Sequence, residues 1–218
     1  MSRRRKPHLR CEACRMHRSL CICALLPRLV TRTRVLLIIH QLEAVKPTNT
    51  GLIAARCLVN SAVLYRGRGP DDKVDTTRDE LARDGVTSLF LFPHADATPL
   101  ESWRGRSEQI QLVVPDATWS QAARMRGRMA RGLPCVSLPA RGVGADRLRA
   151  APRPGRMATL EAVAAALGIL EGPEVDEALM RVYRVMTERT LWTNGRIRTE
   201  DVTGGIPAGV RSHLPLGS

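Results

Sequence analysis

Aromatic residues are scarce in this chain, and long apolar runs are missing. Trp, Tyr and Phe make up 3% of the 218 residues, so the core has to be built from aliphatic side chains. No apolar run approaches the roughly 20 residues of a transmembrane helix, which predicts that the protein has no membrane partner. The basic residues 1–6 are not followed by an apolar segment, so we expect no secretory signal. These absences predict a cytoplasmic protein whose thiols stay reduced.

Acidic residues are also few in comparison with basic ones. Lys and Arg number 34 against 21 Asp and Glu, which gives a formal net charge of +13. Basic side chains that neutralise phosphates release counterions, so this excess indicates a polyanionic partner, with nucleic acid as the leading candidate. A GC-rich genome would explain the preference for Arg over Lys, but it would not explain the excess of basic over acidic residues.

The chain divides into three zones by composition. Residues 1–30 are rich in Cys and Arg, residues 31–202 alternate apolar runs with helical patterns, and residues 203–218 are rich in Gly and Pro and are expected to form a flexible tail. The expected strands are 34–39, 62–65, 88–92, 110–114 and 135–138, and the expected helices are 49–60, 77–84, 119–131, 159–170 and 174–192. This alternation predicts an α/β fold with a mostly parallel sheet and flanking helices.

Four cysteines in the first zone follow the spacing C-x2-C-x6-C-x-C, as Cys11, Cys14, Cys21 and Cys23. Four thiolates in a short polar segment suit tetrahedral zinc, which would order a segment too short to bury a core of its own. Two disulfides are one alternative, which a reducing cytosol disfavours, and His17 in place of one thiolate is another. We expect a small structural zinc knuckle without a catalytic role. Several basic residues beside it could contact RNA: Arg3, Arg4, Arg5, Lys6, Arg10, Arg15 and Arg18.

The tetrapeptide Asp116-Ala117-Thr118-Trp119 is the most informative segment. It follows an apolar run and opens a basic helical stretch, so a carboxylate, a hydroxyl and an indole come together where a strand turns into a helix. Ligands of open α/β sheets bind at the carboxyl ends of strands. Asp116 could act on a ligand or cap the helix, Thr118 could bind substrate or begin the helix, and Trp119 could stack on a base or lie in the core.

Five blocks of this sequence resemble, in order, those of the DTW-domain family. The blocks are the four-cysteine pattern, His40-x-x-Glu43 with Thr48-Asn49-Thr50-Gly51, residues 89–93, Asp116-Ala117-Thr118-Trp119, and Leu148-Arg149-x-x-Pro152 with Thr159-x-Glu161-Ala162. Together they span residues 11 to about 170, which is most of the chain.

The resemblance implies a tRNA-uridine aminocarboxypropyltransferase with a SPOUT-like knotted α/β fold. S-adenosylmethionine would donate its 3-amino-3-carboxypropyl group to N3 of a uridine in tRNA, and methylthioadenosine would be released. Three alternatives stay open: the same donor with a ribosomal RNA substrate, methyl transfer, and a non-enzymatic, zinc-stabilised RNA-binding protein. The sequence determines neither the uridine position nor the oligomeric state.

Site residues follow from the motifs and from the resemblance. We expect Asp116, Thr118 and Trp119 to be catalytic, with Asp116 as the base whose pKa is raised by burial against the indole of Trp119. Loops that hold the donor are expected to contain Leu91, Phe92, Pro93, Leu138, Pro139, Leu148, Arg149, Thr159 and Glu161. Substrate or RNA contacts are expected from His40, Glu43, Thr48, Asn49, Thr50, Arg124, Arg128 and Arg131.

Each of these residues also has a purely structural interpretation. The prolines of the loops end strands, His40 can be a structural histidine, and Glu161 suits the positive end of a helix dipole. The arginines after Trp119 can be a solvated face, and Thr48 or Asn49 caps the helix expected at 49–60. The N-terminus of that helix would attract phosphate or carboxylate.

Overall fold

Six parallel strands form one sheet in the computed structural model of the chain, which describes residues 7–47, 49–67, 79–139 and 157–211. The strand order is β2-β1-β5-β3-β6-β4. The strands are β1 (Arg34–His40), β2 (Ser61–Arg66), β3 (Val86–Leu91), β4 (Thr98–Pro99), β5 (Gln109–Asp116) and β6 (Cys135–Ser137). The prediction of an α/β fold with a parallel sheet is confirmed. Residues 140–156 lie outside the described residues, so the knotted topology stays a prediction.

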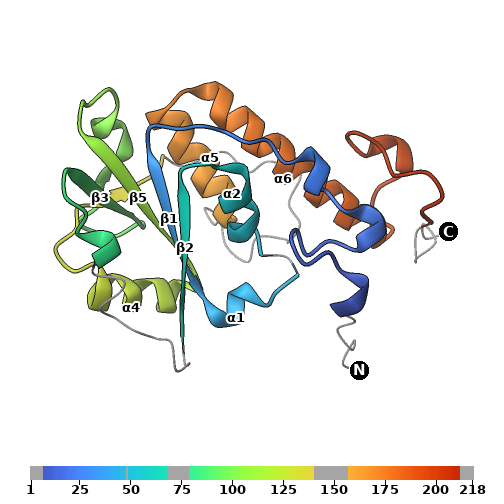
Figure 1. Cartoon of the computed structure of the whole chain (residues 1–218), viewed down its shortest axis with the longest axis horizontal. Helices are drawn as coiled ribbons and strands as arrows, with labels where there is room; N and C mark the ends of the chain where they lie inside the picture. The colour runs from blue at the N-terminus through green and yellow to red at the C-terminus, as the bar shows by residue number, and fades with distance from the viewer. Residues whose placement is uncertain (1–6, 48, 68–78, 140–156, 212–218) are drawn as a thin grey trace.

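Helices cover both faces of this sheet (Figure 1). On one face lie α2 (Gly51–Cys57) and α5 (Thr159–Leu170), and α6 (Pro173–Thr193) packs against α5. On the other face lies α4 (Trp119–Met129). A single turn, α1 (Gln41–Ala44), follows β1. The central strands β1 and β5 are apolar on both sides because helices bury both faces.

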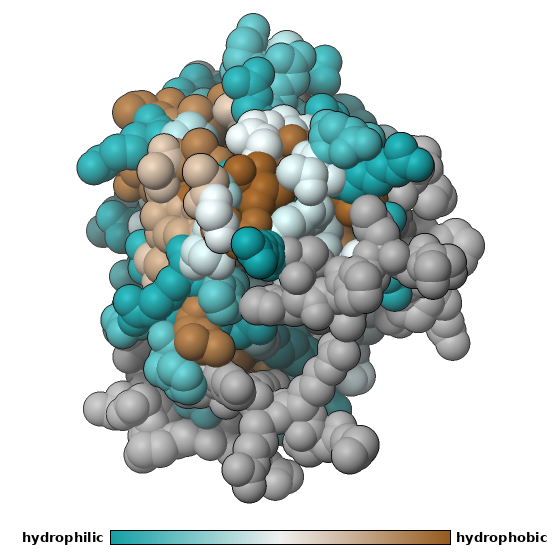
Figure 2. Space-filling model, turned by 90° about the vertical axis from the view of Figure 1, so that its right-hand side faces the viewer, coloured by the Kyte–Doolittle hydropathy of each residue, from teal (hydrophilic) through white to brown (hydrophobic). Residues whose placement is uncertain are grey.

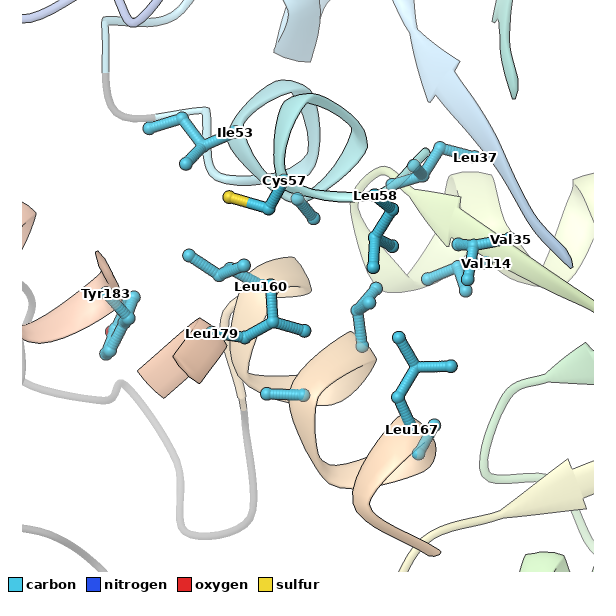
Figure 3. Close-up of a cluster of buried hydrophobic side chains, with 14 of the residues drawn as sticks. Val35, Leu37, Ile53, Cys57, Leu58, Val114, Leu160, Leu167, Leu179 and Tyr183 are labelled. Atoms are coloured by element: carbon cyan, nitrogen blue, oxygen red, sulfur yellow. The ribbon is translucent and has the colours of Figure 1, made fainter. Parts of the chain in front are cut away.

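The larger core lies between the sheet and the helices α2, α5 and α6 (Figure 3). Leu37 of β1 and Val114 of β5 face this layer, and they meet side chains such as Ile53 of α2 and Leu160 of α5. The next residue along β1, Ile38, belongs to the core under α4. The larger core is aliphatic as the composition predicts, and Tyr183 is the one aromatic among its buried residues in the described part of the chain.

Several elements differ in extent from the sequence-based prediction. The helix expected at 49–60 is shorter and comprises only Gly51–Cys57, because Leu58 is already extended on the way into β2. The helix expected at 119–131 ends at Met129, ahead of Gly132 with a φ of 92°. Neither α1 nor β4 is predicted, since elements this short show no periodicity. Most of the helix expected at 77–84 lies outside the described residues, and residues 79–81 are helical.

The chain's terminal zones pack against α6. Arg189 of α6 is 4% exposed and donates hydrogen bonds to the carbonyls of Leu20 (3.3 Å) and Cys21 (3.0 Å) on one side and Gly205 (3.3 Å) on the other. Residues 203–211, expected to be flexible, therefore contact the domain, and the rest of the expected tail lies outside the described residues. The domain boundaries at 30 and 202 stay predictions. No helix in the described part of the chain is both long and apolar enough to span a membrane.

Candidate active site

A buried carboxylate lies at the carboxyl end of the central strand β5. Asp116 is 8% exposed, and its Oδ2 accepts a hydrogen bond from Nδ2 of Asn49 at 2.6 Å, while its Oδ1 accepts one from Oγ1 of Thr159 at 2.8 Å. Burial raises the pKa of Asp116 above the ordinary aspartate value, and the hydrogen bonds from Thr159 and Asn49 oppose this rise. Nearby Glu43 raises the pKa further, and Lys46 lowers it. Asp116 is therefore a carboxylate held through both oxygens in a place that disfavours its charge.

Gly51, the first residue of α2, allows the carboxylate to sit there. A Cβ atom at position 51 would lie 2.4 Å from Oδ2 of Asp116 and 3.1 Å from its Cγ. Any side chain would therefore displace Asp116. The motif Thr48-Asn49-Thr50-Gly51 contains this residue, but sequence reasoning assigned it no role. The available signal was a glycine at the start of a helix. Glycine has a poor helix propensity, so its presence at this position indicates a requirement for close packing or for a special backbone conformation.

The two described residues before Gly51 hold the carboxylate and the neighbouring helices. The N-cap of α2 is Thr50 rather than the expected Thr48 or Asn49, but Oδ1 of Asn49 accepts from the amide of Leu52 in the first turn at 2.9 Å while its Nδ2 donates to Asp116. Oγ1 of Thr50 accepts from the amide of Leu160 at 3.3 Å. Asn49 and Thr50 are 5% and 6% exposed, and their expected contact with substrate or RNA stays a prediction. Thr48 lies outside the described residues.

A carboxylate lies at the N-terminus of this helix, where a phosphate or a carboxylate is expected. The helix α2 has only seven residues, and the negative group at its first residue is the protein's own Asp116. The start of α2 is therefore part of the surroundings of the Asp116 carboxylate.

His40 and Thr118 are linked through Gln121, a residue that the sequence analysis overlooked. Oε1 of Gln121 accepts from the backbone amide of Thr118 at 2.9 Å and from its hydroxyl at 2.8 Å, and Nε2 of Gln121 lies 3.2 Å from Nε2 of His40. The link ties the end of β1 to the start of α4. The spacing Thr118-x-x-Gln121 is that of a capping box, which was the signal that could have identified Gln121. Glu43 forms an ion pair with Lys46 beside them.

Thr118 and Trp119 of the tetrapeptide differ from Asp116 in their surroundings. Thr118 is the N-cap of α4, with its hydroxyl engaged by Gln121. Trp119 is 44% exposed and its ring packs against Phe92 with centroids 5.4 Å apart, so Trp119 is not a core residue. Burial is the main cause of the raised pKa of Asp116, and a contribution of the Trp119 indole to that burial stays a prediction. Residues of α2 and α5 contact Asp116, whereas the indole packs on the side of the sheet that α4 covers.

A cavity of about 340 Å³ opens at the carboxyl ends of β3, β5 and β6. Its walls bring together three segments expected to hold the donor, which come from the end of β3, the end of β6 and the start of α5. The lining residues are Leu91, Phe92, Pro93, Val114, Pro115, Ala117, Trp119, Ala122, Ser137, Leu138, Pro139, Met157, Thr159 and Ala162. Apolar walls with a few polar groups are typical of a small-molecule site. Thr159 both lines the cavity and donates to Asp116, so it joins the cavity to the carboxylate.

Other expected site residues lie elsewhere. Oε2 of Glu161 accepts from the amide of Ala158 at 2.7 Å, which is a capping contact at the start of α5. Leu148 and Arg149 lie outside the described residues. Arg124, Arg128 and Arg131 are exposed on or just after α4. The lining residues Val114, Ser137 and Met157 were not expected, because small and apolar residues carry no motif of their own.

The four cysteines of the N-terminal segment form a group that could hold a metal. Their sulfur atoms all lie within 4.8 Å of one another, with Cys11 and Cys23 3.6 Å apart and Cys14 and Cys21 3.7 Å apart. Tetrahedral zinc with bonds of about 2.3 Å needs sulfur atoms about 3.8 Å apart, so the group fits. A hydrogen bond from the Cys14 amide is the main cause that lowers the pKa of Cys11 to about 6, whereas burial raises the pKa of Cys14 and Cys23. Nδ1 of His17 is bonded to Ser19 instead, at 2.7 Å.

The fold and the site define a class of protein, namely an α/β domain with a small-molecule cavity and a buried acid at the carboxyl ends of its parallel strands. The family model of the DTW domain matches residues 8–191, and the chain belongs to this family. It is similar to tRNA-uridine aminocarboxypropyltransferase 2 of Drosophila melanogaster, with 27% identity over 194 residues that cover 86% of this chain and 77% of that protein. No solved structure matches the chain. The resemblance found in the sequence is confirmed.

Proposed function

We propose that this chain is an enzyme that transfers the 3-amino-3-carboxypropyl group of S-adenosylmethionine to N3 of a uridine in tRNA and releases methylthioadenosine. Membership of the DTW family and the name of the Drosophila relative support this proposal. One observation carries it in the structure. Thr159 lines the cavity and its hydroxyl donates a hydrogen bond to Asp116, so a buried acid with a raised pKa lies one hydrogen bond away from a residue of the cavity wall.

The cavity suits the adenosine part of the donor. Its walls are mainly apolar and include the segments around Leu91 and Leu138, whose backbone groups would recognise adenine in this proposal. The half-exposed indole of Trp119 offers an aromatic face at the same cavity, against Phe92. In this proposal Thr118 acts on catalysis indirectly, by fixing the start of α4 through Gln121.

Asp116 serves as the general base. It accepts the proton of the uridine N3, whose electron pair then attacks the γ-carbon of the aminocarboxypropyl group. The carbon–sulfur bond breaks, and its electrons convert the sulfonium into the neutral thioether of methylthioadenosine. Each carboxylate oxygen can accept more than the one hydrogen bond that Asn49 or Thr159 donates, so a lone pair is available for the proton. A raised pKa makes Asp116 a stronger base than an ordinary aspartate.

The tRNA and the metal complete the proposal. Arg124 and Arg128 of α4 and Arg131 after it are exposed beside the tetrapeptide and would contact RNA phosphates. The four cysteines would hold a structural zinc ion, which leaves no open coordination position for catalysis. Zinc would order the N-terminal segment, whose Leu20 and Cys21 carbonyls accept hydrogen bonds from Arg189 of α6.

The test uses an unmodified tRNA transcript and donor labelled either in the carboxypropyl group or in the methyl group. After digestion to nucleosides, mass spectrometry is expected to find label from the carboxypropyl group in uridine. We expect Asp116→Asn to lose this product and Glu108→Gln, which alters an exposed carboxylate, to keep it. Transfer of the methyl label, modification of ribosomal RNA alone, or no product from a protein that binds both donor and tRNA would each overturn the proposal.

A further inference from the structure

A second cavity, of about 290 Å³, lies between the cysteine segment and the segment that leads from α1 to α2. We call it the arginine pocket. Its walls include His8, Arg10, Arg15 and Arg18 on one side and Val45 and Pro47 on the other. Glu12 is the single acidic residue among the lining residues, so basic side chains dominate the pocket. Figure 2 shows the side of the molecule on which the N-terminal segment lies, where hydrophilic side chains surround a small apolar area.

Two of the three guanidinium groups are held in place before any ligand binds. Nη1 of Arg10 donates to the carbonyl of Arg15 at 2.9 Å, and Nε of Arg18 donates to the carbonyl of His8 at 3.1 Å. A guanidinium carries five N–H donors in a planar fork, so each retains further donors for an anion. Binding to groups that are already fixed loses less side-chain entropy than binding to mobile ones.

Arg15 keeps its side chain at a position where glycine would fit the backbone better. Its φ is 61°, and no other non-glycine residue in the described part of the chain has a positive φ. The turn brings the amide of Arg15 to the carbonyl of Cys11 at 2.9 Å, within the loop that carries the first two cysteines. A strained conformation that persists in a bulky residue points to a function of its side chain.

The pocket is connected to the catalytic carboxylate through a short, hydrogen-bonded segment. Val45 and Pro47 belong to the turn in which the amide of Lys46 donates to Glu43 at 2.9 Å and the amide of Asn49 donates to Lys46 at 3.1 Å. The side chain of Asn49 in turn donates to Asp116. An anion in the pocket therefore lies against the same segment that positions the candidate base.

We propose that the arginine pocket binds a backbone phosphate of the RNA substrate and thereby orients the RNA toward Asp116. The identity of the RNA as tRNA rests on the proposed function. The planar fork of a guanidinium matches the oxygens of a phosphate. Binding of a phosphate by the Arg15 side chain would give a function to the strained backbone conformation of this residue. The cysteine segment then has two roles, because the metal folds it and its outer surface contacts the RNA.

The experiment measures binding of an unmodified tRNA transcript at several salt concentrations, without donor. Arg15→Gly removes the cation and relaxes the backbone, so the variant is expected to keep its zinc and its melting temperature. Its affinity for tRNA is expected to fall several-fold, and the slope of log K against log salt to decrease by about 0.7–0.9, the value of one phosphate contact. Arg15→Lys is expected to recover part of the affinity, and Glu12→Gln is expected to bind more tightly than the wild type.

Arg184→Gln is the matched control, because it removes an exposed arginine from α6. We expect it to leave affinity and salt slope unchanged. The proposal would be overturned if the zinc-loaded Arg15→Gly protein bound tRNA with the affinity and salt slope of the wild type. It would also be overturned if Arg184→Gln lost as much affinity for tRNA as Arg15→Gly. Since binding is measured without donor, a protein that never forms the modified uridine could still pass this test, and the two proposals fail separately.

Discussion

Replacing Gly51 with alanine tests the geometry of the candidate site most directly. The new Cβ would lie 2.4 Å from Oδ2 of Asp116, whereas ordinary contacts begin at 3.4 Å, so the carboxylate has to move by about 1 Å. The hydrogen bonds from Asn49 at 2.6 Å and Thr159 at 2.8 Å depend on its present position. Cδ2 of Leu37 would lie 3.3 Å from the new Cβ atom, so the alanine side chain cannot move away from Asp116 toward Leu37.

The expected loss of stability follows from these two hydrogen bonds. A hydrogen bond to a charged group contributes about 1.5–3 kcal/mol, so losing both costs about 3–6 kcal/mol. Alanine gains about 0.5–1 kcal/mol over glycine in a helix, which offsets a small part. We therefore expect Gly51→Ala to lower the free energy of unfolding by about 2–5 kcal/mol. Turnover should fall further than stability explains, because the base is displaced.

Urea denaturation and single-turnover transfer measure these effects. Gly127→Ala is the matched control, because a Cβ at this position of α4 meets nothing within 4 Å, and we expect it to gain up to about 1 kcal/mol. The double variant Gly51→Ala/Asp116→Ala should be less destabilised than the sum of its single variants by about 2 kcal/mol or more, since the clash is gone. A Gly51→Ala protein as stable and active as the wild type would refute the reasoning.

Three further predictions concern the base, the buried arginine and the indole. Transfer should fall as the pH drops through the raised pKa of Asp116, and Thr159→Val, which removes a hydrogen bond that lowers this pKa, should move the acid limb of the pH–rate profile to higher pH; an unmoved limb contradicts this. Arg189→Met should destabilise the protein by about 2–4 kcal/mol and speed zinc release to a chelator, whereas unchanged release would contradict the docking role. Trp119→Ala should raise the KM for the donor about tenfold with little loss of stability, Trp119→Phe much less, and an unchanged KM would exclude stacking.

Sequence patterns predicted the elements whose signals are local. The apolar runs of β1 and β5 and the alternation with helices predicted a parallel sheet, because strands buried on both faces are continuously apolar. The motifs also indicated which loops meet, since the carboxyl ends of parallel strands share one edge of the sheet. The role of Gly51 and the link through Gln121 escaped prediction, because their partners are distant in the sequence.

The amino-acid sequence by itself determined the class of fold, the candidate metal site of four cysteines, and the position of Asp116 at the end of a strand. These properties depend on spacing and periodicity over a few residues. Only the tertiary structure decided the surroundings of Asp116, because its partners Asn49 and Thr159 are 67 and 43 residues away in the chain. The parallel register that places Ile39 of β1 beside Asp116 carries the following α2 to the carboxylate. Burial, together with the hydrogen bonds from Asn49 and Thr159, therefore sets the chemistry of this acid.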